Sequence, residues 1–130
     1  MAKVVNCRVQ YIRPKYQNLK EWCDDCENNV YIGRKGVVFV QDSGLKRRYP
    51  TEDSIFYNPY KIGKDGCRQE VIDKYRKYIL HKIDQGEITK EEIMRLRGKN
   101  LGCWCSPEPC HGDVLVELIH QIQTENNSGS

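Results

Sequence analysis

The chain has 130 residues, of which 38% are hydrophobic and 30% are charged. This balance suits one domain with a modest core and excludes an intrinsically disordered chain. The formal net charge of +3 does not by itself indicate a dedicated nucleic-acid-binding protein. No apolar run approaches the roughly 20 residues that cross a bilayer, and the N-terminus lacks a secretory signal, so we expect a cytoplasmic protein with no membrane partner.

Seven cysteines are many for this length. Because no export signal is visible, we expect no disulfide framework, and cysteines in a reducing compartment serve as buried small side chains, metal ligands or reactive thiols. Cys23 and Cys26 form a Cys-x-x-Cys pair without a preceding βαβ pattern. We therefore interpret this pair as part of a polar surface loop rather than as a redox site.

The first half of the chain predicts short strands. Apolar and β-branched runs favour strands over residues 4–9, 30–34 and 37–40. The last two could pair as a hairpin through Lys35–Gly36, or the strand over 30–34 could end in a functional loop beside a separate buried strand. Both alternatives stay open. The basic run Lys46–Arg48 follows a predicted turn and is interpreted as a solvated loop.

The helices are predicted by periodicity and caps. A short helix is expected around Leu19–Trp22. Apolar residues recur on one face of Arg68–Ile83, which predicts a long amphipathic helix. Thr89 and Glu92 form a capping box that starts a further helix, which runs to about Arg97.

The C-terminal part completes the predicted domain. A short strand over residues 101–105 precedes a helix that starts near His111 and ends at about Gln121. We expect a single small α/β domain over residues 1–123, with a mixed or mostly parallel, Rossmann-like sheet and flanking helices. Residues 124–130 are expected to form a disordered tail.

The segment from Gly102 to Asp113 concentrates the reactive side chains between a predicted strand and a predicted helix. Ligands of open α/β sheets bind outside the carboxyl ends of strands, and a helix N-terminus favours an anion. His111 could act as a general acid or base, with Asp113 orienting its ring. Cys110 or Cys105 could be a reactive thiolate, because a helix N-terminus and an imidazolium lower a thiol pKa. The candidate catalytic residues are Cys110, His111 and Asp113.

The same segment could instead bind zinc. Three thiols and an imidazole could converge as a tetrahedral site made by Cys103, Cys105, Cys110 and His111. Cys103 and Cys105 alternate along the predicted strand and so point to one face. However, Cys-x-Cys followed by adjacent Cys-His departs from common zinc-finger spacings.

Other residues suit a phosphate-bearing ligand. Gly33 permits close backbone approach, and Arg34 offers a planar bidentate partner for phosphate. Asn58 with Tyr60 offers an amide and an aromatic face for a base or a sugar. The candidate ligand-binding residues, from the predicted strands, loops and helix starts, are Asn6, Arg8, Gly33, Arg34, Asn58, Arg68 and Gly112.

Four stretches, of which the Cys-Trp-Cys…Cys-His-Gly-Asp motif is the most specific, together resemble a known family. They are Val4–Arg8, Tyr31–Arg34, Asn58–Arg68 and Gly102–Leu115. The family, domain of unknown function 4326, has microbial, phage and large-DNA-virus members. The chain departs from its pattern at Tyr57, where the family has glycine before Asn-Pro. The resemblance implies a compact α/β fold in the cytoplasm of a microbe or a virus-infected host cell, and it implies no reaction.

Three functional hypotheses follow. The first is a site for a nucleotide or a nucleotide-derived molecule at the N-terminus of the last helix, which could hydrolyse or transfer its ligand. The second is a non-enzymatic zinc module that contacts nucleic acid or protein. The third is a thiol-based redox or covalent-catalysis protein. The sequence leaves open whether the protein is an enzyme.

Overall fold

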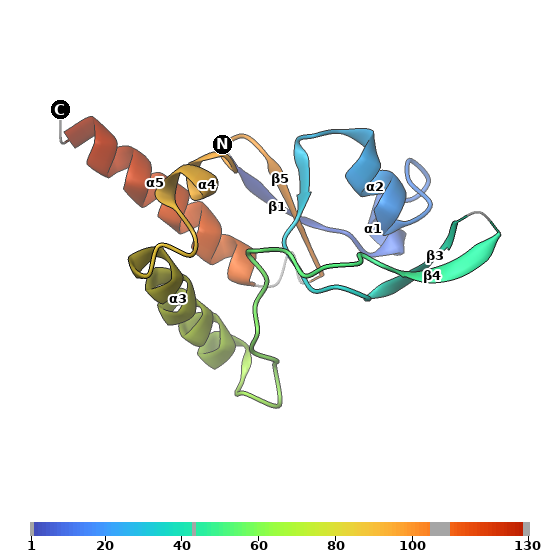
Figure 1. Cartoon of the computed structure of the whole chain (residues 1–130), viewed down its shortest axis with the longest axis horizontal. Coiled ribbons are helices and arrows are strands. Elements are labelled where there is room, and N and C mark those ends of the chain that lie inside the picture. The colour runs from blue at the N-terminus through green and yellow to red at the C-terminus, as the bar shows by residue number, and fades with distance from the viewer. Residues whose placement is uncertain (1, 43, 105–109, 129–130) are drawn as a thin grey trace.

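Three parallel strands form the centre of the molecule (Figure 1). They are β1 (Lys3–Asn6), β5 (Asn100–Cys103) and β2 (Asn29–Tyr31), in the spatial order β1-β5-β2. This parallel sheet with flanking helices confirms the predicted α/β class. This computed structural model describes residues 2–42, 44–104 and 110–128.

Successive residues of each strand point to opposite faces of the sheet, so each face carries its own core. On one face Val4 and Leu101 join the main core. On the other face Gly102 lets Cys7 and Trp22 approach closely, because a Cβ atom at Gly102 would lie 2.6 Å from the Cys7 sulfur and 2.8 Å from the Trp22 ring. Glycine in the central strand is therefore required by packing.

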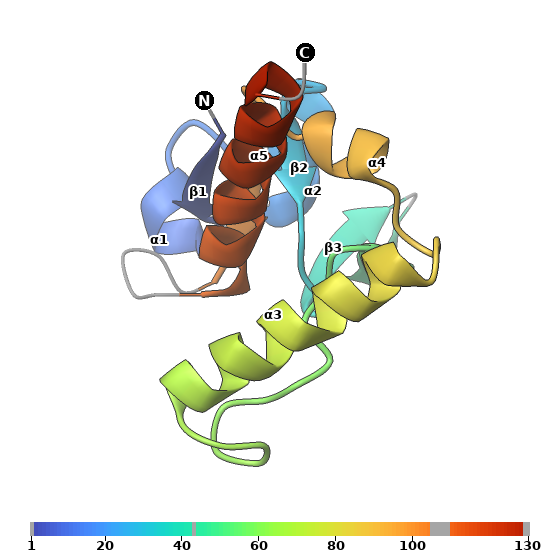
Figure 2. The ribbon, with the colours of Figure 1, turned by 90° about the vertical axis from the view of Figure 1, so that its left-hand side faces the viewer.

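Helices cover both faces (Figure 2). α5 (His111–Ser128) packs on β1 and β5, and α3 (Arg68–Asp84) and α4 (Lys90–Met94) pack against α5. α1 (Val9–Ile12) and α2 (Leu19–Asp25) carry the second core on the opposite face. Within the part of the chain that the structure describes, none of these helices combines the length and the apolar character that a bilayer crossing needs.

The helix predictions near the middle of the chain are confirmed in type and starting point, but α4 ends at Met94 rather than near Arg97. α3 begins at Arg68 as expected, and the capping box of α4 is present, with Thr89 Oγ1 accepting from the Glu92 N–H at 3.1 Å and Glu92 Oε1 accepting from the Thr89 N–H at 3.0 Å. The predicted end of the last helix near Gln121 is wrong, because α5 continues to Ser128. Residues 122–128 contain no glycine or proline to stop it.

Two strand predictions extend too far. The strand over residues 4–9 ends at Asn6, whose side chain accepts from the Arg8 N–H at 3.0 Å and turns the chain into α1. The strand over residues 30–34 ends at Tyr31. Cys105, expected at the end of the last strand, lies outside the described residues.

Of the two alternatives left open for residues 30–34 and 37–40, the structure excludes the hairpin and shows two separate strands. β3 (Val38–Asp42) pairs antiparallel with β4 (Leu45–Tyr49), while β2 pairs with β5. The basic run is accordingly a strand rather than a loop. Gly36 has φ of 66°, a left-handed turn between β2 and β3 that favours glycine.

Candidate functional site

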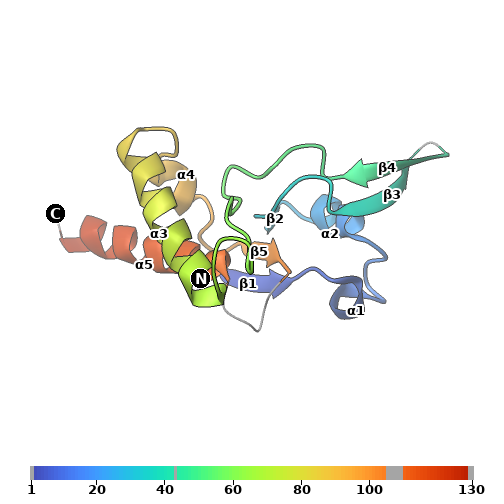
Figure 3. The same cartoon turned by 90° about the horizontal axis from the view of Figure 1, so that it is seen from below.

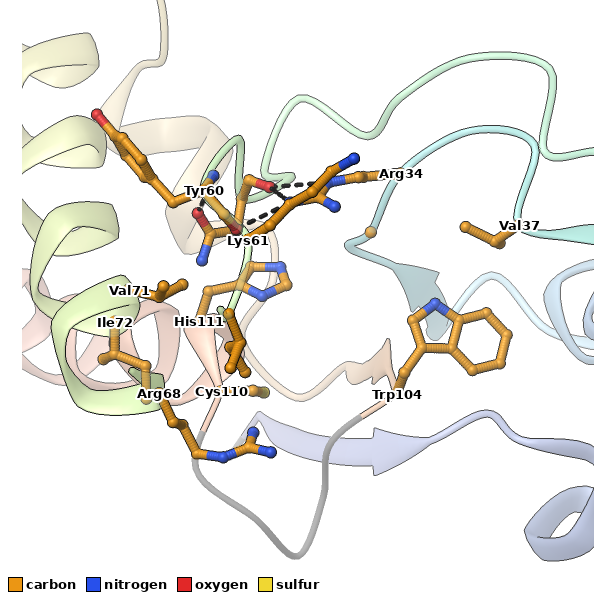
Figure 4. A pocket seen from close by; sticks show the side chains of 13 residues that line it. Arg34, Val37, Tyr60, Lys61, Arg68, Val71, Ile72, Trp104, Cys110 and His111 are labelled. Carbon is orange, nitrogen blue, oxygen red and sulfur yellow. Dashed lines mark hydrogen bonds between the residues drawn. The ribbon is translucent and has the colours of Figure 1, made fainter. Parts of the chain in front are cut away.

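A pocket of about 350 Å³ lies where β2 and β5 end and where α3 and α5 begin (Figure 4). This is the edge at which open α/β sheets bind ligands. We call it the strand-end pocket. The described residues that line it are Gly33, Arg34, Val37, Asn58, Tyr60, Lys61, Ile62, Arg68, Val71, Ile72, Trp104, Cys110 and His111.

Arg34 forms one side of the strand-end pocket and holds a loop in place. Its Nε and Nη2 atoms donate to the Asn58 carbonyl oxygen at 3.1 and 2.7 Å, and Nη2 also donates to the Tyr60 carbonyl oxygen at 2.8 Å (Figure 4). The Asn58 side chain folds back and accepts from the Tyr60 N–H at 2.9 Å, which makes a local turn. The Arg34 guanidinium therefore holds the loop around Asn58 and Tyr60 in position.

His111 opens α5, and its ring is held from two sides. Nε2 lies 2.7 Å from the Ile32 carbonyl oxygen, and since a carbonyl only accepts, Nε2 carries the hydrogen. The Tyr75 ring meets the imidazole edge-on, with 4.9 Å between ring centroids. Burial lowers the pKa of His111; the bond to Ile32 opposes this shift, and nearby Arg34 adds to it. A neutral ring with a lone pair on Nδ1 suits a proton acceptor.

The Cys110 thiol packs against Cys103, with 3.3 Å between the two buried sulfur atoms. This contact, followed by burial, raises the pKa of the Cys110 thiol. The hypothesis of a reactive thiolate at Cys110 requires the opposite shift. The pKa is raised because the Cys110 sulfur faces a second thiol inside the protein. This effect outweighs the lowering of the thiol pKa that a helix N-terminus would cause. Cys110 is therefore a protonated, inward-facing thiol at neutral pH.

Asp113 and Gly112 shape the start of α5 and do not line the strand-end pocket as the structure describes it. Asp113 Oδ2 accepts from the Cys110 N–H at 3.0 Å, which caps the helix. The imidazole is oriented by Ile32, a role that the sequence analysis gave to Asp113. A Cβ atom at Gly112 would lie 3.0 Å from Ile32 Cδ1 and from Val4 Cγ2, so this glycine serves helix–sheet packing.

Asn6 and Arg8 secure the chain where β5 ends. Arg8 Nε donates to the Trp104 carbonyl oxygen at 3.2 Å, and Asn6 Nδ2 lies 3.5 Å from the same oxygen. Trp104 Nε1 in turn donates to Tyr31 Oη at 3.0 Å. These contacts fix the indole on the pocket wall. Neither Asn6 nor Arg8 is among the described lining residues.

The composition of the strand-end pocket is cationic and aromatic. Arg34, Lys61 and Arg68 line it together with Tyr60 and Trp104, and no acidic side chain is among the lining residues within the described ranges. Guanidinium groups recognise phosphate oxygens through paired hydrogen bonds. Aromatic rings offer a flat apolar surface to a planar group.

The predicted zinc ligands are only partly described. Cys103 and Cys110 lie together, whereas His111 directs Nε2 to the Ile32 carbonyl, and Cys105 lies outside the described residues. Among the residues that the structure does describe, no group of three or more His, Cys, Asp or Glu side chains could hold a metal ion. The zinc hypothesis stays a prediction.

The structure brings six of the predicted site residues to one pocket. They are Gly33, Arg34, Asn58, Arg68, Cys110 and His111. Lys61 and Trp104 also line it but were not selected from the sequence. Trp104 stands inside the Cys-Trp-Cys motif, which could have drawn attention to it. Lys61 carries no comparable signal.

The fold and the strand-end pocket define a small α/β domain with a parallel sheet and a cationic cavity at its strand ends. Residues 15–121 match the family described as "Domain of unknown function (DUF4326)", and the chain belongs to this family. This confirms the resemblance noted in the sequence.

Relatives of the chain occur in viruses. It is 41% identical over 68 residues to an "Uncharacterized 12.4 kDa protein in nrdA-td intergenic region" of Enterobacteria phage T4. The aligned region covers 52% of the chain and 62% of the phage protein. The chain thus spans less than two thirds of that relative. It is 33% identical over 115 residues to "Uncharacterized protein R718" of Acanthamoeba polyphaga mimivirus, covering 82% and 77% of the two chains. No solved structure matches the chain significantly.

Proposed function

We propose that the strand-end pocket binds a nucleotide or a nucleotide-derived, phosphate-bearing small molecule. The supporting observation is the lining itself, which combines three cationic side chains and two aromatic side chains without a carboxylate among the described residues. Lys61 and Arg68 supply cations for phosphate groups, and the Trp104 indole supplies a flat surface for the base or another planar group.

In this proposal the phosphate is bound by side-chain cations rather than by the main-chain N–H groups at the start of α5. Near the start of α5, the Cys110 N–H already donates to Asp113 Oδ2 at 3.0 Å, and the Gly112 N–H donates to the Cys110 sulfur at 3.3 Å. These amides therefore have acceptors of their own. The sequence hypothesis of a phosphate beside Gly112 is thus refined toward Lys61 and Arg68.

Within this proposal His111 carries any proton transfer in hydrolysis or group transfer. Its lowered pKa keeps Nδ1 unprotonated near neutral pH, and the ring lies on the pocket wall. Cys110 is a poorer candidate, because its raised pKa keeps the nucleophilic thiolate scarce.

The test is isothermal titration calorimetry against a panel of nucleoside mono-, di- and triphosphates, dinucleotides and free phosphate, supported by indole fluorescence. Arg68→Gln and Lys61→Gln should each weaken binding roughly 10- to 100-fold, the effect of losing a charge-assisted hydrogen bond. Lys77→Gln, an exposed charge change elsewhere on α3, is the matched control. Absence of binding across the panel, or equal binding by all variants, would refute the proposal.

The second candidate function is zinc binding at Cys103 and Cys110. It is favoured by the adjacent buried sulfur atoms of these two residues. Native mass spectrometry of the reduced protein should then show one bound zinc, lost in Cys110→Ser. A protein that contains no zinc after growth with added metal would contradict it.

A further inference from the structure

The β3–β4 hairpin projects from the body of the domain, at the opposite end from the C-terminal end of α5 (Figures 1 and 3). Its strands pair antiparallel, with Phe39 opposite Arg48 and Gln41 opposite Lys46. This arm is separate from the central sheet and lies outside the set of residues that line the strand-end pocket.

The two faces of the hairpin differ. Val40 is buried, and Val38 and Tyr49 pack against the second core, so one face is turned to the protein. Phe39 and its cross-strand partner Arg48 belong to the other face, since opposed residues of an antiparallel pair share a side. The outward face is therefore accessible along its length.

The outward face carries an aromatic ring between cations. Phe39 is 54% exposed, which is unusual for a side chain of its size. Lys46 Nζ lies 5.1 Å and Arg48 Cζ 4.8 Å from the centre of its ring. Arg48 Nη1 also donates to the Gly36 carbonyl oxygen at 3.1 Å, which anchors the guanidinium at the base of the arm.

Charge is concentrated on this arm. Between Val38 and Tyr49 the sequence has three cations, Lys46, Arg47 and Arg48, and one carboxylate, Asp42, a net +2 against the +3 of the whole chain. Alternating cations with an exposed aromatic ring are the chemistry by which proteins bind single-stranded nucleic acid, through phosphate contacts and base stacking.

We propose that the outward face of the β3–β4 hairpin, with Phe39, Lys46 and Arg48 at its centre, binds single-stranded nucleic acid. The cations contact phosphates, and Phe39 stacks on a base. This surface is independent of the ligand proposed for the strand-end pocket, so either proposal can fail without the other.

The test is fluorescence anisotropy of the full chain with labelled oligouridine and oligothymidine at several salt concentrations. The wild-type affinity should fall steeply with salt. A double substitution of Lys46 and Arg48 to Gln should weaken binding at least tenfold and reduce the salt slope by about 1.4. Phe39→Ala should weaken binding roughly 5- to 150-fold and leave the slope unchanged, since stacking releases no counterions.

A double substitution of the exposed residues Lys77 and Lys90 to Gln removes the same charge elsewhere and should bind like the wild type. Thermal unfolding of every variant checks that it is folded. The proposal is overturned if the wild type binds neither oligonucleotide, if it prefers duplex, if it binds anionic vesicles in place of oligonucleotides, or if the control double variant weakens binding as much as the Lys46 and Arg48 double variant.

Discussion

The Nε2 hydrogen of His111 is donated to the carbonyl oxygen of Ile32 over 2.7 Å, and this bond ties the start of α5 to the residue that follows β2. It joins two segments that are distant in sequence. Burial lowers the pKa of the imidazole and keeps it neutral, although the bond to Ile32 opposes this shift. The same contact therefore serves stability and any proton chemistry in the strand-end pocket.

The first prediction concerns pH. The folded pKa of His111 is lowered from its ordinary value of 6.5. Its contribution to stability is thus present above about pH 6.5 and is lost as the pH falls below it, since the unfolded chain then binds a proton that the folded chain resists. Chemical denaturation of the EDTA-treated protein should show this loss.

His111→Phe should abolish that pH-dependent component and reduce the free energy of unfolding by about 1–3 kcal/mol at neutral pH, because the Ile32 carbonyl loses its donor. His120→Phe changes an exposed histidine of the same helix and is the control. Equal pH dependence in the wild type and His111→Phe would contradict the assignment.

The second prediction concerns helix–sheet packing. Gly112→Ala should lower the free energy of unfolding by about 1–3 kcal/mol, the usual effect of overpacking. The added methyl group would meet Val4 Cγ2 and Ile32 Cδ1 at 3.0 Å. In urea denaturation Gly112→Ala combined with Val4→Ala should cost less than the two single changes added together. Strict additivity would show that Val4 does not restrict this position.

The third prediction concerns the loop that Arg34 holds. Arg34→Lys keeps the charge but loses the planar fork that serves the Asn58 and Tyr60 carbonyls. Loss of charge-assisted bonds of about 1.5–3 kcal/mol should speed tryptic cleavage after Lys61 and Lys64 roughly tenfold or more. Arg76→Lys alters two exposed ion pairs, one with Asp73 on α3 and one with Glu117 on α5, and should be cleaved like the wild type.

The fourth prediction concerns the thiols. Peptide mapping after brief alkylation at neutral pH should find the exposed Cys67 modified at least about tenfold faster than the buried Cys103 and Cys110. Burial excludes the reagent, and the raised pKa of Cys110 keeps its thiolate scarce. If Cys110 were alkylated as fast as Cys67, the thiol-catalysis hypothesis would be strengthened.

Local signals predicted the local structure. α3 and the capping box of α4 follow from periodicity and from side-chain to backbone bonds within a few residues of each other. The choice of strand partners did not follow, because pairing joins segments that are distant in the chain, such as β2 and β5, and local patterns do not encode it. Neighbouring apolar runs therefore suggested a hairpin that the fold does not contain.

In the candidate site, too, the sequence indicates reactive side chains but not the long-range contacts that position them. Residues with distinctive side chains, such as Arg34, Arg68 and His111, could be proposed from the sequence, and the structure places them in the lining of one pocket. The acceptor for His111 is a main-chain carbonyl, which leaves no trace in residue identity. The loop-holding role of Arg34 likewise depends on a contact with Asn58, which is remote in the chain.

The position of β5 between β1 and β2 has a consequence for synthesis on the ribosome. Lys3 pairs with Asn100, and Asn29 pairs with the same residue from the other side, so no strand pair of the sheet can form before the C-terminal strand is made. Such distant pairings slow folding, because long loops must close first. The nascent chain therefore leaves the exit tunnel with its two N-terminal strands unpaired, and cellular chaperones have a long interval in which to engage it.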